Sequence, residues 1–141
     1  MEGLRDLGSL IGRVMLALIF VMSGFSKVTG FAGTAGYMAA HGIPQTLVYP
    51  GLLLTIAVEL GCGLLVVVGF QARLAALAIF LWLIPVTMLF HFIPYRNDVA
   101  QGQTMEALTN LAMILKNLSM MGGLLFVSSR GPGGYSIDGG S

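Results

Sequence analysis

Two ionisable side chains deep inside apolar stretches of the sequence are the first candidates for chemistry. Glu59 lies within the stretch 47–70 and Lys116 within the stretch 105–127. At 1.5 Å per helical residue, both fall roughly 17 Å from the same face of a membrane. An ionised group at the bilayer centre costs about 2.5–3.5 kcal/mol, so each needs a partner or a purpose. We predict that Glu59 and Lys116 pair, with Asn117 as an additional donor and acceptor, either as a structural salt bridge or as a proton or ligand site.

His91 is the second candidate because no other histidine lies in an apolar stretch. Its depth leaves a contact with Glu106 open, and its role is either that of a hydrogen-bonded structural residue or that of an acid–base group. The other histidine, His41, belongs to a loop, and Cys62 is the single cysteine. These residues provide no ligand set at metal-binding spacing, so the sequence predicts no metal site.

Three basic residues are secondary candidates. Arg13 and Lys27 lie near opposite ends of the first apolar stretch and share one helical face with Ala17, Phe20 and Gly24. We expect that face to point inward and the two cations to snorkel to the headgroups. Arg73 lies in the short polar connection 71–73.

The elements that position these side chains follow from composition. Of the 141 residues, 56% are hydrophobic and only 9% are charged, and the mean hydropathy is +0.88. A soluble domain carries about 25% charged residues. Four stretches approach the roughly 20 residues that a spanning helix needs, namely 9–26, 47–70, 74–94 and 105–127. The sequence therefore predicts an all-α, integral-membrane four-helix bundle over residues 1–127, followed by a flexible tail rich in glycine, serine and proline at 128–141.

Loops and charges predict the topology. The connection 71–73 is short enough to make its two helices antiparallel neighbours, and the segment 30–50 is expected to form an interfacial hairpin. Basic residues on the side of the termini outnumber those on the other side, which favours both termini in the cytoplasm. The formal net charge of +1 provides no basic surface for nucleic acid.

Several motifs, taken in order, resemble the DoxX family of small bacterial inner-membrane proteins. In the first half of the chain the similar segments are Gly24-Phe25-Ser26-Lys27, Gly30-Phe31-Ala32-Gly33-Thr34, Tyr37-Met38 and Gly42-x-Pro44. They continue with Glu59-Leu60-Gly61-x-Gly63, Gly69-Phe70, Arg73, Phe90-His91, Lys116-Asn117, Gly122-Gly123 and the tail Gly131-Pro132-Gly133-x-Tyr135-Ser136-Ile137-Asp138. The resemblance covers nearly the whole chain, and the ordered combination is specific.

The resemblance implies a multi-pass four-helix bundle in the bacterial inner membrane. The family takes its name from the small subunits of an archaeal quinone-linked sulfur-oxidising enzyme, and some members are described as parts of membrane oxidoreductase complexes. By position, the family's recurrent polar residues correspond here to Lys27, Glu59, Arg73, His91, Lys116 and Asn117. The resemblance transfers no catalytic role to them.

Three hypotheses for function follow. In the first, the chain binds a quinone or a similar amphipathic molecule between its helices, with Glu59, His91, Lys116 and Asn117 supplying donors and an exchangeable proton, and supports a membrane redox or stress-response process. In the second, the chain is a non-catalytic membrane partner that assembles with other proteins, or with its own copies, through glycine-rich helix faces. The third, a proton-coupled transporter, is less favoured because no pair of broken helices is evident. Whether the chain is an oxidoreductase subunit stays open.

Overall fold

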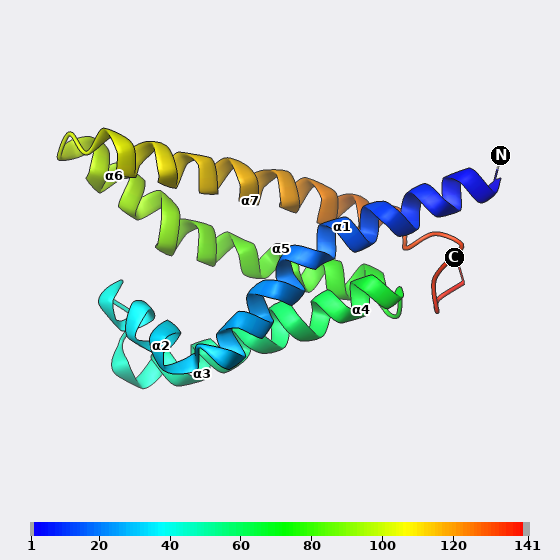
Figure 1. The fold of residues 1–141 in the computed structure, drawn as a ribbon, viewed down its shortest axis with the longest axis horizontal. Helices are drawn as coiled ribbons and strands as arrows, with labels where there is room; N and C mark the ends of the chain where they lie inside the picture. Colours follow the sequence, from blue (N-terminus) through cyan, green and yellow to red (C-terminus); the bar gives the residue numbers. More distant parts are fainter. Residues whose placement is uncertain (1, 140–141) are drawn as a thin grey trace.

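The computed structural model describes residues 2–139, which contain helices and no strands (Figure 1). Four of the helical runs are long and apolar enough to cross a membrane, namely Gly3–Thr29, Gln45–Val68, Ala72–Ala100 and Thr104–Arg130. This confirms the predicted all-α bundle of four spans. The two ends of the chain lie at the same end of the bundle in Figure 1, and the prediction that this end is cytoplasmic stays a prediction.

Two of the four spans are interrupted by a wider, π-helical turn. The elements in order are α1 (Glu2–Thr29), α2 (Phe31–Ala40), α3 (Gln45–Ile56), η1 (Ala57–Cys62), α4 (Gly63–Val68), α5 (Ala72–Thr87), η2 (Met88–Phe92), α6 (Ile93–Ala100) and α7 (Thr104–Arg130). Turns of this kind inside α-helices are frequent at functional sites. Glu59 lies in η1 and His91 lies in η2, so both intramembrane candidates occupy irregular helical turns.

The third and fourth helices are longer than the hydropathy of the sequence indicates. The third span was expected to end at residue 94, before a polar loop at 95–104, but α6 continues to Ala100 and leaves only 101–103 as the connection. Pro94 does not stop the helix, and it lies in the first turn of α6, directly after the wider turn η2. Likewise, α7 ends at Arg130 rather than at residue 127. Hydropathy marks the apolar core of a span, and helices extend beyond it into the polar headgroup region.

Close packing of the first two spans depends on glycine. The predicted inward face of α1 is confirmed, since Arg13, Ala17, Phe20 and Gly24 are all buried. A Cβ atom added at Gly24 would lie 2.7 Å from the backbone nitrogen of Leu60, and one at Gly63 would lie 3.1 Å from the side chain of Val21. Only glycine allows the backbones of α1 and η1 to approach this closely.

The remaining helices form a second arm. The helices α5 and α7 run side by side, and their contact buries Ile79, Leu83, Leu124 and Val127 in the core of the bundle. In Figure 1, α1 and α4 lie close to this arm near the chain ends, and the first two spans diverge from it toward α2 and α3. The bundle is therefore closed at the end of the termini and spread at the other.

The tail returns to the closed end of the bundle. Arg13 is 2% exposed, and its guanidinium donates to the backbone carbonyls of Val67, Pro132 and Tyr135 at 3.2, 2.5 and 2.7 Å. The carboxylate of Asp138 accepts hydrogen bonds from the first amides of α5, at 3.1 and 3.2 Å. The expectation that Arg13 snorkels is wrong, because carbonyls of the tail and of α4 reach its charge inside the protein. The tail thus has specific contacts with the bundle, and its flexibility stays a prediction.

Candidate functional site

A cavity of about 520 Å³ lies at the spread end of the bundle, between α2, α3 and η1 on one side and α5 and η2 on the other. Small-molecule sites typically have volumes of about 300–1,000 Å³ and are mostly apolar with a few placed polar groups. The lining here has that character. Leu47, Leu54 and Leu89 line it and are exposed.

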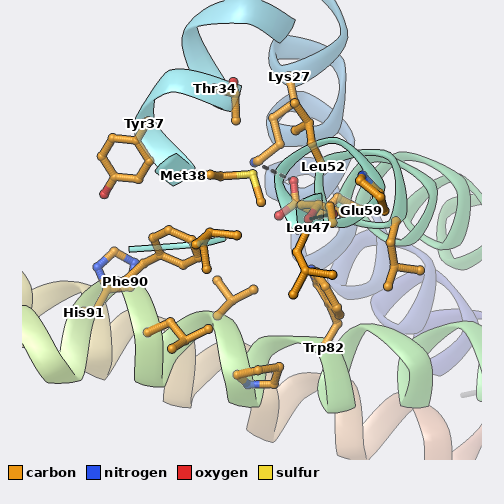
Figure 2. A pocket seen from close by; sticks show the side chains of 18 residues that line it. Lys27, Thr34, Tyr37, Met38, Leu47, Leu52, Glu59, Trp82, Phe90 and His91 are labelled. Atoms are coloured by element: carbon orange, nitrogen blue, oxygen red, sulfur yellow. Dashed lines mark hydrogen bonds and ion pairs between the residues drawn. The ribbon is translucent and has the colours of Figure 1, made fainter. Parts of the chain in front are cut away.

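The strongest polar feature of the cavity is an ion pair between the first two spans. Lys27 Nζ lies 2.7 Å from Glu59 Oε2 and 2.6 Å from Ser23 Oγ (Figure 2). Glu59 is 7% exposed, and the side chain of Lys27 is 22% exposed. The close approach at Gly24 places Lys27, one turn further along α1, beside the turn that carries Glu59. The expectation that Lys27 snorkels to the headgroups is therefore wrong.

The predicted pair between Glu59 and Lys116 is wrong. The turn that carries Glu59 packs on α1 and α5, whereas α7 packs on α5, α6 and η2. Lys116 is exposed on α7, and within the described residues its one side-chain hydrogen bond runs to the sulfur of Met113 at 3.4 Å. Equal depth in the membrane is not sufficient to predict a pair, because it does not tell which helix faces which.

Trp82 supplies a free donor on the same cavity. Its indole Nε1 is buried and, among the side-chain nitrogens and oxygens of the described residues, it is the one buried atom without a hydrogen-bond partner. Leaving such a donor unpaired costs about 1–3 kcal/mol. Trp82 lines the cavity together with Glu59, and Figure 2 shows its indole extending from α5 toward the Glu59 side. Sequence reasoning missed Trp82, although the one tryptophan in the chain, placed mid-span, needs a partner for its N–H.

Aromatic rings form the opposite wall. The ring centroids of Tyr37 and His41 are 4.0 Å apart, and those of Tyr37 and Phe90 are 5.8 Å apart. His91 lies beside Phe90 and also lines the cavity. Of the four leading candidates from the sequence, the structure therefore brings Glu59 and His91 to one cavity and leaves Lys116 and Asn117 outside it.

His91 is oriented by a polar chain rather than by the glutamate considered from the sequence. Its Nδ1 lies 3.4 Å from Asn110 Oδ1, and Asn110 Nδ2 donates to Asp98 Oδ2 at 2.8 Å. Because Asp98 accepts from the amide nitrogen, the amide oxygen of Asn110 faces His91, and Nδ1 of the imidazole is then the donor. Glu106 is exposed in the first turn of α7.

The two other candidates have structural contacts. Asn117 is 2% exposed and donates through Nδ2 to Thr87 Oγ1 at 2.9 Å, which joins α7 to the end of α5. Arg73 donates to the carbonyl of Ser129 at 2.7 Å, near the end of α7. Both residues hold helices together away from the cavity.

The fold and the cavity define a class of protein: a small four-span membrane bundle with an amphipathic cavity between its second and third spans. The DoxX family model matches residues 8–92, and the chain belongs to the DoxX family. Its four apolar helices and two relatives named as inner membrane proteins make it a multi-pass protein of the inner membrane.

Two relatives from Escherichia coli (strain K12) align along most of the chain. Inner membrane protein YqjF is 37% identical over 138 residues, which cover 98% of this chain and 95% of YqjF. Inner membrane protein YphA is 35% identical over 130 residues, 92% of this chain and 86% of YphA. A Bacillus subtilis (strain 168) protein named "Putative oxidoreductase CatD" is 33% identical over 79 residues, 56% of each chain. No solved structure matches the chain.

Proposed function

We propose that the protein binds a quinone, or an amphipathic molecule with a similar carbonyl-bearing head, in the cavity between its second and third spans. The observation that carries this proposal is the meeting of three polar groups in one apolar space: the Lys27–Glu59 pair and the unpaired N–H of Trp82. A ligand carbonyl that accepts from Trp82 would satisfy the orphaned donor, a gain available only when the cavity is filled.

The position of the cavity suits a ligand that arrives from the lipid. Its lining includes leucines that are exposed, so an apolar chain attached to the head can stay in the bilayer. Glu59 supplies a carboxylate next to the head, and the aromatic wall around Tyr37 and Phe90 offers faces for stacking. We place the bound molecule in a membrane redox process, and the name of the Bacillus relative favours that setting.

The test uses Trp82 as a built-in probe, because it is the one tryptophan and it lines the cavity. Decylubiquinone is titrated into the purified protein in dodecyl maltoside micelles while tryptophan fluorescence is recorded. We expect saturable quenching whose midpoint rises at least about 10-fold in Glu59→Gln, equivalent to a loss of about 1.4 kcal/mol. The matched control is Lys116→Met, which changes a charge at similar depth outside the cavity and should leave the midpoint unchanged. Linear quenching that is the same in all three proteins would contradict the proposal.

A further inference from the structure

Lys116 is a cation in the middle of a spanning helix with no ionic partner in the described part of the chain. At 1.5 Å per residue it lies about 18 Å from the start of α7 at Thr104 and about 21 Å from its end at Arg130. Its ammonium contacts the thioether of Met113, and a thioether is only a weak acceptor. The side chain is exposed on the outer surface of the bundle rather than enclosed in it.

Neither lipid headgroups nor this chain's own acids account for Lys116. Lysines snorkel from positions near helix ends, whereas Lys116 lies near the centre of a hydrocarbon layer about 30 Å thick. Glu59 is buried and bound to Lys27. Glu106, on the same helix, is ten residues and therefore about 15 Å away along the axis.

A second copy of the chain does not supply an ionic partner for Lys116 either. Copies inserted in the same membrane have the same orientation, so a symmetric contact through this face brings one Lys116 against the other at equal depth, and like charges repel. A copy that used a different face would have to offer a carboxylate at this depth. Asp98 lies in α6 and Asp138 in the tail, each near one end of the bundle, and neither reaches the middle.

The surface around Lys116 is shaped for a helix. Ala112 and Ser119, four residues before and three after, are exposed on the same side of α7 and are small. One turn beyond Ser119, a Cβ at Gly123 would lie 3.1 Å from Leu16 of α1, so α1 covers the stripe there. In Figure 1, α1 then diverges from α7 toward α2, and the rest of the stripe is exposed. Small residues of this kind allow another helix to approach closely.

We propose that the uncovered stripe of α7, formed by Ala112, Lys116 and Ser119, docks a spanning helix of a different membrane protein that carries an Asp or Glu at mid-membrane depth. The carboxylate pairs with Lys116 and removes the cost of exposing its charge to lipid. This inference is independent of the cavity, because Lys116 does not line it.

The test is photocrosslinking in the native membrane. p-Benzoylphenylalanine is placed at Ser119, or as a control at Leu125, which is also exposed and lies about 120° around α7 from Ser119. After irradiation, the adducts and the crosslinked segments are identified by mass spectrometry. We expect Ser119 alone to yield an adduct with a spanning segment of another protein that contains Asp or Glu, and Lys116→Met to reduce the yield at least 10-fold.

A charge exchange separates lost pairing from misfolding. Lys116→Glu should abolish the adduct, and changing the partner's acid to lysine in the same cell should restore it. The proposal is overturned if the adduct is a second copy of this chain, if it contains only lipid, if the crosslinked segment has no carboxylate, or if Lys116→Met leaves the yield unchanged.

Discussion

The two ends of the bundle each hold a cation from α1, and they satisfy it in different ways. At the closed end, Arg13 donates to three backbone carbonyls from α4 and the tail. At the spread end, Lys27 meets a carboxylate, and the pair faces a cavity that also contains an unpaired donor. A guanidinium fixed by neutral carbonyls locks backbone segments together. The ion pair instead lies on the wall of an open apolar cavity. Under the proposed function, the closed end stabilises the bundle and the spread end binds the ligand.

The largest effect should come from breaking the closed end. Arg13→Met keeps an unbranched apolar chain in the site but removes the donor of the Val67 and Tyr135 carbonyls and leaves that of Pro132 with Ser9 Oγ alone. We expect the free energy of unfolding in detergent to fall by at least about 3 kcal/mol and the tail to become sensitive to protease. The control is Arg5→Met, which removes an exposed cation from the same helix. If both variants are equally stable, the closed end is not a structural lock.

The sequence predicts the features that depend on positions along the chain, but not the contacts between helices. The four spans and the inward face of α1 follow from hydropathy and from spacing along one helix, and both are confirmed. Glu59 and His91 stand out because polar groups in apolar stretches are costly, and both line the cavity. These inferences use only distances along the chain.

The errors concern contacts between elements. Pairing Glu59 with Lys116 required knowing which helix faces the second span, and that depends on the glycine contact at Gly24, which depth does not reveal. The contacts of Arg13 could not be predicted because its partners in the tail are backbone carbonyls, which every residue has and which no side-chain pattern reveals. The sequence did offer one further indication, the indole N–H of Trp82, which needs a hydrogen-bond acceptor inside an apolar span.

An intermediate effect should come from the ion pair. Glu59→Gln alone leaves Lys27 without a charge partner, and we expect a loss of about 2 kcal/mol in unfolding free energy. This is below the 3–5 kcal/mol typical of breaking a buried pair, because the side chain of Lys27 is 22% exposed. Replacing both residues by methionine should recover stability to within about 1 kcal/mol of the wild type, because no uncompensated charge remains.

The double replacement also separates stability from binding. If the pair serves a ligand, the protein with methionine at both positions should be stable and yet show no saturable quenching by decylubiquinone. Thermal unfolding and the fluorescence titration, made on the same samples, report the two properties together. If the double variant recovers both stability and saturable quenching, the pair is a structural feature like Arg13, and the two ends do not differ in function.

The smallest effect is expected at Asp138, and it asks whether the two ends are independent. The carboxylate caps the start of α5 by accepting from the amides of Gln71 and Ala72. Asp138→Asn keeps one acceptor oxygen but removes the negative charge at a helix N-terminus, so a loss of about 1 kcal/mol in unfolding free energy is expected. Because α5 also carries Trp82, the quenching midpoint is the sensitive measurement. An unchanged midpoint means that the contact of Asp138 with α5 affects only stability. A shift of more than about two-fold means that tail contacts are transmitted along α5 to the cavity.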